Sequence, residues 1–306
     1  MKLTLIKPNI GRREHSLYVD EARMEPLMLG VLAALTPPDV EVVFFDDRME
    51  PIRYDDSTDL VAITVETYTA RRAYEISAEF RIRGIPVILG GMHVALIPEE
   101  AGLHADSILI GDAELIWGDV ITDARYGQLK PRYFGPPGIG QVNGIMPRRD
   151  IFKGKGYLPV SLIQFSRGCR FACDFCAVSR YFEKQHYLRH IDEVILEIES
   201  QERKFLFFVD DNIASDRYGL KELCNALIPM KIHWISQASL DVTGDSELMG
   251  LMEKSGCLGN VMGFESITPE NLKQSKKNPN IECFSNYEHE VKILREYGMQ
   301  TWAAFT

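Results

Sequence analysis

Three cysteines lie close together near the middle of the chain, in a run that ends at Cys176. Cys169, Cys173 and Cys176 follow the spacing C-x3-C-x2-C, which brings three thiolates onto one short loop. Three ligands are what a [4Fe–4S] cluster needs if one iron is to stay open, whereas electron-carrier clusters use four cysteines. The spacing therefore favours a cluster with one open iron.

Zinc is the alternative ligand for the same thiols. A structural zinc site needs four ligands, and His186 or His190 could supply the fourth. Zinc fingers usually pair two C-x2-C knuckles, and the chain has no second knuckle, so the cluster is favoured. Cys224, Cys257 and Cys283 stand singly in apolar surroundings, and we expect them to be buried.

Strands and helices alternate after the cysteines. The pattern predicts strands at 160–165, 205–209, 233–237, 260–264 and 301–306, and helices at 191–201, 218–227, 246–255 and 287–297. Five βα repeats that lack the last helix indicate a parallel barrel left incomplete. Such barrels carry their chemistry on the loops after the strands. We therefore expect the cysteine loop to converge with the loop segments 210–212, 237–239 and 265–266.

The polar residues of these loops also have plain structural explanations. Asp210 and Asp211 could cap the helix that follows them. Gln237 and Ser239 could simply make loop hydrogen bonds. The basic run from Lys273 to Lys277 is expected to be a solvated surface loop.

The first part of the chain predicts a separate domain. Apolar runs at 3–6, 40–45, 60–65, 87–89 and 108–110 alternate with helical patterns at 26–35, 69–83, 98–103 and 114–124. Nearly all-apolar strands indicate a parallel sheet covered on both faces. We expect a five-stranded, doubly wound, Rossmann-like α/β domain over residues 1–125.

Ligands of such sheets bind beyond the carboxyl ends of the strands. The candidate binding residues at those ends are Asn9, Asp47, Thr64, Glu66, Thr67, Gly90, Gly91, His93, Gly111 and Glu114. The glycines let a ligand approach the backbone, although they could equally serve tight strand-to-helix turns. No G-x-G-x-x-G follows the first strand, so the dinucleotide fingerprint is absent.

Residues 126–159 are rich in glycine and proline, which predicts an extended connector before the second domain at 160–306. The 306 residues carry 34 basic against 44 acidic side chains, and the net charge of −10 argues against a nucleic-acid or anionic-membrane binder. No apolar run is long enough to span a bilayer, and no signal peptide is evident. We therefore expect a cytoplasmic protein.

The motifs resemble the radical S-adenosylmethionine (SAM) superfamily, in particular the subfamily with an N-terminal cobalamin-binding domain. The resemblance rests on the cysteine motif with Phe175 before its third cysteine, on Arg167-Gly168, and on the runs 207–212 and 262–266. In the first domain, the runs 90–93, 98–100 and 111–114 are similar to the cobalamin-domain pattern. The resemblance spans nearly the whole chain.

The resemblance implies three cofactors: a [4Fe–4S] cluster, SAM and cobalamin. SAM would chelate the open iron, and its reductive cleavage would give a 5′-deoxyadenosyl radical. Asp210 and Asp211 would contact the ammonium of SAM, Glu265 the ribose, and the Phe175 backbone the adenine. Gln237, Ser239 and Ser266 are further SAM candidates. An electron donor of flavodoxin or ferredoxin type would reduce the cluster.

Cobalamin would bind without an imidazole ligand. Methionine-synthase-like domains hold cobalt through D-x-H-x-x-G, which this chain lacks; His15, His93 and His104 lie in other contexts. Tyr68, Arg71 and Arg72 could line the corrin face or start a solvated helix. The alternative is a domain that has lost its ligand.

The resemblance implies methylation of an unactivated centre in a small-molecule or lipid-like substrate. A radical enzyme of the same architecture that catalyses cyclisation, rearrangement or C–C bond formation is the alternative. A non-catalytic cobalamin or zinc sensor is a further one. The family's barrel has six βα repeats, so we expect a sixth unit or a partner to cover the last strand, which would otherwise expose Trp302 and Phe305.

Overall fold

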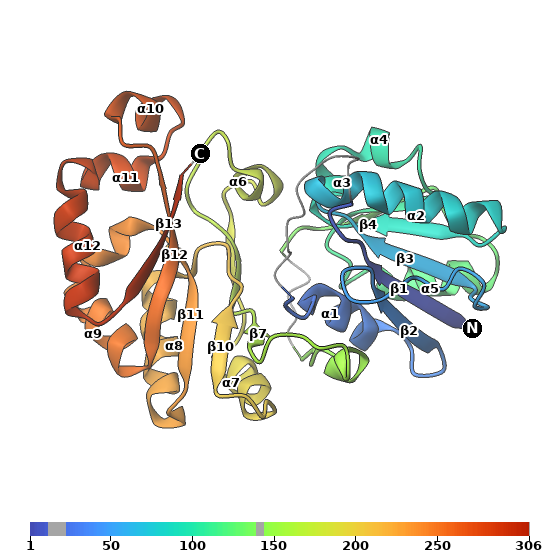
Figure 1. Cartoon of the computed structure of the whole chain (residues 1–306), viewed down its shortest axis with the longest axis horizontal. Helices are drawn as coiled ribbons and strands as arrows, with labels where there is room; N and C mark the ends of the chain where they lie inside the picture. The colour runs from blue at the N-terminus through green and yellow to red at the C-terminus, as the bar shows by residue number, and fades with distance from the viewer. Residues whose placement is uncertain (12–22, 139–143, 306) are drawn as a thin grey trace. The chain divides into compact units, whose positions relative to one another are not determined.

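The computed structural model describes residues 1–11, 23–138 and 144–305; His15 lies outside these ranges. The chain forms two compact units, Met1–Leu158 and Pro159–Thr306 (Figure 1). The second unit begins one residue before the predicted start of the second domain. Each unit is an α/β unit built on a parallel sheet.

The first unit contains a six-stranded sheet. Its elements are β1 (Lys2–Lys7), α1 (Leu27–Leu35), β2 (Glu41–Asp46), β3 (Leu60–Thr64), α2 (Ala70–Ile82), β4 (Val87–Gly90), α3 (Met92–Leu96), α4 (Pro98–Ala101), β5 (Ser107–Gly111), α5 (Trp117–Arg125) and β6 (Arg132–Gly135). The strand order is β2-β1-β3-β4-β5-β6, and all neighbours run parallel. The order turns back between β1 and β3, which makes this the switch point where ligands of open α/β sheets bind.

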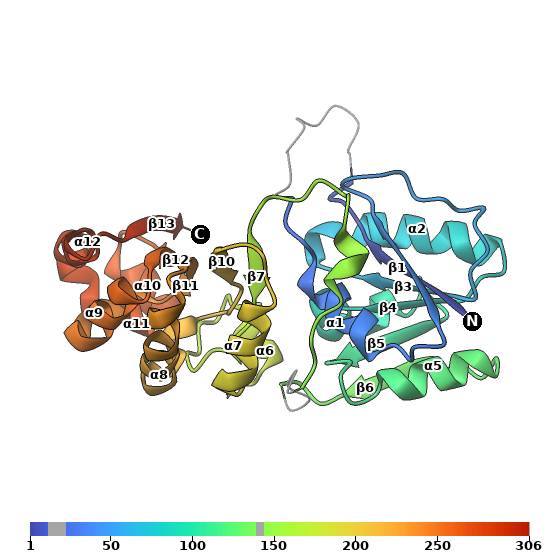
Figure 2. The same ribbon diagram turned by 90° about the horizontal axis from the view of Figure 1, so that it is seen from below.

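Helices cover both faces of this sheet because its strands are apolar on both sides. Leu29 of α1 and Val120 of α5 pack with Leu5 against one face, whereas Ile76 of α2 packs with Ile63 on the other. Figure 2 shows α2 and α5 on opposite sides of the strands. The doubly wound arrangement expected from the sequence is therefore present.

The expected extended connector is wrong in its first part. Residues 132–135 form the sixth strand, which pairs with β5 at the edge of the sheet. Tyr133, Phe152 and Tyr157 join the apolar core of the first unit. The glycine and proline content concealed these contacts, because an edge strand of four residues tolerates prolines directly after it.

The second unit contains a five-stranded parallel sheet in the order β13-β12-β11-β10-β7. Its principal elements are β7 (Ser161–Ile163), β8 (Ser166–Gly168), α6 (Ala177–Tyr181), β9 (His186–Leu188), α7 (Ile191–Glu199), β10 (Phe205–Phe208), α8 (Arg217–Leu227), β11 (His233–Ala238), α9 (Ser246–Lys254), β12 (Cys257–Glu265), α10 (Pro269–Gln274), α11 (Asn278–Cys283), α12 (Tyr287–Glu296) and β13 (Gln300–Phe305). The predicted strand 160–165 is shorter in the structure, because β7 ends at Ile163; a further strand, β8, begins at Ser166 and pairs antiparallel with β9.

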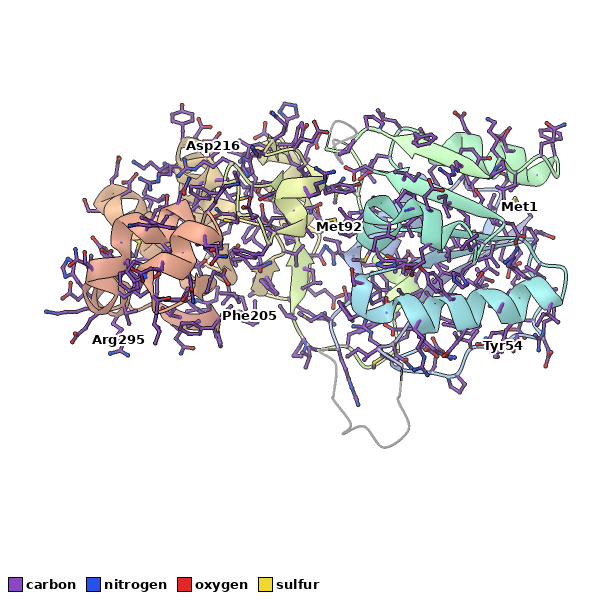
Figure 3. The ribbon with its side chains drawn as sticks, turned by 90° about the horizontal axis from the view of Figure 1, so that it is seen from above. Met1, Tyr54, Met92, Phe205, Asp216 and Arg295 are labelled. Carbon is purple, nitrogen blue, oxygen red and sulfur yellow. The ribbon has the colours of Figure 1, made fainter. Side chains whose placement is uncertain are left out.

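The two faces of this sheet differ in their cover. On one face, Leu206, Trp234 and Met262 are fully buried, and they form one apolar core with side chains of the helices. The alternate residues Phe207 and Ile235 are only half-buried. Asp216, labelled in Figure 3, begins α8. Its carboxylate accepts a hydrogen bond from the backbone N–H of Gly219 at 2.9 Å.

Strand β13 lies at an edge of the sheet. Trp302 is 44% and Phe305 57% exposed, as the sequence predicted. The sixth βα unit stays a prediction.

Candidate functional site

The cysteine loop directly follows β8, which pairs antiparallel with β9. Gly168, the residue before Cys169, pairs with His186 across the hairpin and has a φ of +85°. A Cβ at this position would lie 2.2 Å from the carbonyl oxygen of Gln185. Only glycine fits this close approach, so the glycine holds the base of the loop in shape.

The three thiols differ in exposure, since Cys169 and Cys176 are partly exposed and Cys173 is buried. Cys173 is buried, and burial raises the pKa of its thiol to about 11, with a further rise from Cys176 and Cys169 and an opposing effect of Lys277. Across residues 1–11, 23–138 and 144–305, no group of three or more His, Cys, Asp or Glu side chains is placed to hold a metal ion. A cluster would be bound by the three thiols in their deprotonated form.

Asn212, after β10, connects the loop to the next strand. Its side-chain N–H donates to Sγ of Cys169 at 3.5 Å and to Oγ of Ser239 at 3.1 Å. Its Oδ1 accepts from the backbone N–H groups of Ala214 and Ser239. The side chain is 4% exposed, so all of its contacts are fixed by the fold.

Asp210 does not have the position expected of a SAM ligand. It is fully buried, and its carboxylate accepts hydrogen bonds from the backbone N–H of Phe165 and from the N–H and hydroxyl of Ser166. Burial raises the pKa of Asp210 to about 7, although these hydrogen bonds oppose the rise. We therefore correct the expected ammonium contact: Asp210 fixes the bend between β7 and β8.

Asp211 and Gln237 also contact the backbone of the site. Asp211 accepts from the backbone N–H of Gly168 at 2.8 Å, and Gln237 donates to the carbonyl of Asp210 at 3.3 Å. The expected capping by the two aspartates is wrong, because Asn212 caps the turn at 213–215 and Asp216 caps α8. Their contacts bring β10 and β11 to the base of the cysteine loop.

Glu265 and Lys277 form a nearly buried ion pair beside the loop. The two side chains are 9% and 13% exposed, and Lys277 lies 5.8 Å from the centre of the half-exposed Phe175 ring. Glu265 has a φ of +62°, which is rare for a residue other than glycine. The expectation of a solvated basic run is thus wrong for Lys277, while Ser266 lies on the turn that leads away from β12.

Asn280 was missed by the sequence reasoning. It is fully buried, and its amide donates to the carbonyls of Gly263 and Phe264 and to the hydroxyl of Tyr287. It anchors α11 to the end of β12 and so places Lys277 over Glu265. No local motif marks such a residue, because its partners are backbone groups distant in sequence.

A cavity of about 480 Å³ adjoins the other side of the loop. Arg170 and Arg217 both donate to Oδ2 of Asp241 at its wall, at 2.9 and 2.8 Å. Cys283 also lines the cavity and is only half-buried. The expected burial is therefore found for Cys224 and Cys257 but not for Cys283.

In the first unit, several candidate residues at the strand ends are already paired. Lys7 is buried at the end of β1 and contacts Glu66 across the switch point, where both line a cavity of about 260 Å³. Arg72 makes two hydrogen bonds to Asp47 at 2.8 and 2.9 Å, and Asn9 binds Asp47 as well. These pairs shape the carboxyl edge of the sheet.

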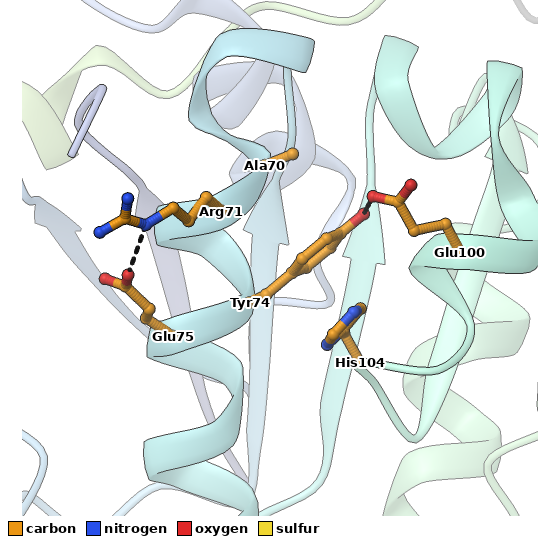
Figure 4. Close-up of a pocket in the computed structure, with 6 residues that line it drawn as sticks. All are labelled: Ala70, Arg71, Tyr74, Glu75, Glu100 and His104. Carbon is orange, nitrogen blue, oxygen red and sulfur yellow. Dashed lines mark hydrogen bonds and ion pairs between the residues drawn. The ribbon is translucent and has the colours of Figure 1, made fainter. Parts of the chain in front are cut away.

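His93 belongs to a chain of hydrogen bonds from Thr67 to Glu100. Tyr74 donates to Glu100 at 3.1 Å, so its oxygen accepts from Nε2 of His93, also at 3.1 Å. Nδ1 of His93 lies 3.3 Å from the hydroxyl of Thr67. The Tyr74 ring stacks on His104, and both line an open hollow of about 520 Å³; Figure 4 shows its lining residues. Both ring nitrogens of His93 are thus engaged.

The glycines at the strand ends serve close backbone approach. Gly91 has a φ of +107°, and a Cβ there would lie 2.7 Å from the carbonyl oxygen of Val65. A Cβ on Gly111 would lie 1.8 Å from the carbonyl oxygen of Gly135 in the neighbouring strand. Gly90 ends β4 with ordinary space around it, Thr64 ends β3, and Glu114 lies in the loop after β5. The turn explanation therefore accounts for Gly91, which lies between β4 and α3, whereas Gly111 makes room for the neighbouring strand β6.

Relatives with assigned activities are similar to nearly the whole chain. No family model matches it. Bacteriochlorophyllide d C-8(2)-methyltransferase of Chlorobaculum tepidum is 30% identical over 94% of the chain and 68% of its own length. The C-12(1)-methyltransferase of the same organism is 29% identical over 97% of the chain and 67% of its own length.

A solved structure has the same fold. The radical SAM methyltransferase TsrM from Kitasatospora setae, with cobalamin and a [4Fe–4S] cluster bound, superposes with a TM-score of 0.74 at 20% identity. The superposition covers 99% of this chain and 69% of TsrM. The chain belongs to the cobalamin-binding radical SAM family. It is accordingly an enzyme, which removes the non-catalytic sensor from the alternatives.

The residues present fit the cofactors of this family. Three thiols on one loop, with an amide N–H directed at one of them, match the donor set of a cluster that keeps one iron open. In the first unit, the cavity of about 260 Å³ at the switch point gives room for part of a ligand. In the described part of the chain, no helix is long and apolar enough to cross a membrane.

Proposed function

We propose that this radical SAM enzyme is a cobalamin-dependent methyltransferase that methylates an unactivated centre of a small molecule. The observation that carries the proposal is the cysteine loop in a chain 30% identical to a methyltransferase of this family over 94% of its length. Asp211 and Asn212, which follow β10, reinforce it by contacting the loop at Gly168 and Cys169.

Cys169, Cys173 and Cys176 would hold the cluster, and the residues after β10, β11 and β12 would bind SAM beside it. When bound there, the cluster would supply the electron for reductive cleavage of SAM, and cobalamin would supply methyl-transfer chemistry. Asp211 remains the candidate for the ammonium of SAM, because it contacts the base of the cysteine loop at Gly168, whereas Asp210 is fully buried.

Glu265 would accept hydrogen bonds from the ribose hydroxyls of SAM. Lys277 donates to Oε1 of Glu265 and so fixes the orientation of the Glu265 carboxylate. The exposed ring of Phe175 stands over Lys277 and would cover the adenine side of the site. Together these residues would orient SAM and exclude water from the open iron.

In the first unit, cobalamin would bind at the carboxyl edge of the sheet without a histidine below cobalt. Both nitrogens of His93 already have partners, so His93 would act as a wall of the site. Tyr68 is exposed and lies next to Lys7 at the switch point, where its ring could contact the corrin. Arg71 and Arg72 pair with acidic side chains, which favours the structural explanation for them.

The substrate would bind on the half-covered face of the second sheet. Phe207, Ile235 and Val261 are half-buried there, and exposed Trp302 pairs with Val261 in the next strand. A row of apolar and aromatic side chains suits a large apolar or planar molecule. Bacteriochlorophyllide d, the compound in the names of both curated relatives, is therefore the first substrate to test.

The test is anaerobic incubation of the reconstituted chain with SAM, cobalamin, a chemical reductant and bacteriochlorophyllide d, followed by mass spectrometry of the nucleosides and the pigment. Methyl transfer predicts S-adenosylhomocysteine and 5′-deoxyadenosine together with a methylated product. 5′-Deoxyadenosine without S-adenosylhomocysteine would instead support cyclisation, rearrangement or C–C bond formation. If Cys173→Ala still cleaved SAM reductively, the assignment of the cluster would be wrong.

A further inference from the structure

We propose that Asn212 is a positioning residue that raises the reduction potential of the cluster through its hydrogen bond to Cys169. The inference rests on the cluster of the proposed function. It assigns to Asn212 a role that none of its other contacts requires. The decisive juxtaposition is the side-chain N–H at 3.5 Å from Sγ of a cluster cysteine.

The direction of the N–H group is fixed from two sides. Oδ1 of Asn212 accepts from the N–H of Ala214 at 3.3 Å and from the N–H of Ser239 at 3.2 Å. These acceptor contacts orient the amide plane, which leaves Nδ2 to face Cys169 and the hydroxyl of Ser239. Because the residue is 4% exposed, water does not compete for the donor.

The physical consequence concerns charge on sulfur. A thiolate ligand carries negative charge, and reduction of the cluster adds one electron to that charge. A hydrogen bond from a buried N–H stabilises the more negative state more strongly, so it raises the potential. Asn212 would thus ease the electron transfer that precedes SAM cleavage.

The capping role of Asn212 can be separated from this effect. Capping uses only Oδ1, and both aspartate and serine are good capping residues. Asn212→Asp keeps an oxygen at the capping position and removes the N–H, but adds a charge. Asn212→Ser also removes the N–H and stays neutral, so the pair of variants distinguishes loss of the donor from gain of a charge.

Asn260 offers a matched control. It is fully buried in the same unit, and its Nδ2 donates to Sγ of Cys257 at 3.8 Å, which is a similar contact to a cysteine outside the cluster motif. Asn260→Ser removes a buried N–H···S bond without touching the cysteine loop. General loosening of the unit would affect this variant as much as Asn212→Ser.

The experiment is anaerobic reconstitution of the full chain, measurement of iron and sulfide, and a redox titration followed by EPR. We expect both Asn212 variants to bind the cluster with a midpoint potential shifted to more negative values, and Asn260→Ser to keep the wild-type potential. An unchanged potential in Asn212→Ser, or an equal shift in Asn260→Ser, would overturn the inference. Absence of a cluster from the wild-type chain would instead refute the proposed function.

A second measurement covers the case in which the variants lose the cluster. In wild-type protein labelled with ¹⁵N in its asparagine amides, pulse EPR of the reduced cluster should detect one coupled side-chain nitrogen. If no such coupling is found, Asn212 does not contact the cluster and the inference fails whatever the variants do.

Discussion

The ammonium of Lys277 lies 2.9 Å from Oε1 of Glu265 and 5.8 Å from the centre of the Phe175 ring. One lysine therefore ties the end of β12 to the cysteine loop. Gly263 leaves the space for this pair, since a Cβ there would lie 2.0 Å from Oε1 of Glu265. The site depends on a contact between segments that are distant along the chain.

Lys277→Ala should destabilise the second unit by roughly 3 kcal/mol, because it leaves the nearly buried carboxylate of Glu265 without its partner. Urea unfolding measures the loss, and hydrogen exchange should increase over 266–286. Lys276→Ala is the control: Lys276 pairs with Asp174, but both side chains are more than half exposed, so less than about 1 kcal/mol is expected. Equal losses in the two variants would contradict the buried ion pair.

Gly168→Ala should reduce the amount of cluster bound. The new Cβ would lie 2.2 Å from the carbonyl oxygen of Gln185, at a backbone conformation that costs alanine about 1 kcal/mol or more. The base of the cysteine loop must then shift. Iron and sulfide analysis after reconstitution measures the loss. Gly250→Ala in α9, where nothing lies within 4 Å, should bind the full cluster; full occupancy in Gly168→Ala as well would refute the geometric argument.

Asp210 should make the second unit less stable as pH rises. The pKa of Asp210 in the folded state is about 7, above the ordinary value of 3.8. Between pH 3.8 and 7, Asp210 is therefore protonated in the folded state and ionised in the unfolded state. Proton binding stabilises the folded state fully below pH 3.8, and this stabilisation is lost as the pH rises through 7. The expected loss is roughly 3 kcal/mol from pH 4 to 7, since each pKa unit corresponds to about 1.4 kcal/mol.

Asp210→Asn removes this titration. The difference in unfolding free energy between wild type and variant should decline between pH 5 and 7 and then become flat. Urea titrations at several pH values measure it. A difference that does not change with pH would show that Asp210 is ionised throughout, held so by Phe165 and Ser166.

Cobalamin bound to this chain should lack a histidine ligand. His93 uses one ring nitrogen for Tyr74 and the other for Thr67, so neither is free for cobalt. EPR of the Co(II) form should therefore show the same pattern with ¹⁴N- and ¹⁵N-labelled histidine. A change in the splitting on labelling would reveal an imidazole ligand and refute this arrangement.

Tyr74→Phe tests the hydrogen-bond chain itself. Loss of the hydroxyl leaves Nε2 of buried His93 without its partner, which should cost about 1–3 kcal/mol in the stability of the first unit. Chemical unfolding of the full chain, followed by a probe in the first unit, measures this cost. Tyr126→Phe is the control, because Tyr126 is 75% exposed and should tolerate the change. Equal stabilities of the two variants would show that the hydrogen bonds between Thr67, His93, Tyr74 and Glu100 contribute nothing to the stability of the first unit.

The sequence by itself determined the cysteine loop, the doubly wound first unit and the parallel order of the second. Local spacing suffices for these: C-x3-C-x2-C fixes which thiols share a loop, and alternating apolar runs fix which residues end at the same edge of a sheet. It also determined the exposure of Trp302 and Phe305 at the edge strand.

Only the tertiary structure decided which polar residues at those edges lie beside the cysteine loop. Asp210 and Asp211 are neighbours in one motif, yet one is buried under backbone N–H groups and the other reaches the cysteine loop. Lys277 pairs with Glu265 and does not extend into solvent, because Asn280 anchors α11 to the end of β12. Such choices depend on partners distant in sequence, whose desolvation and hydrogen bonds no local pattern encodes.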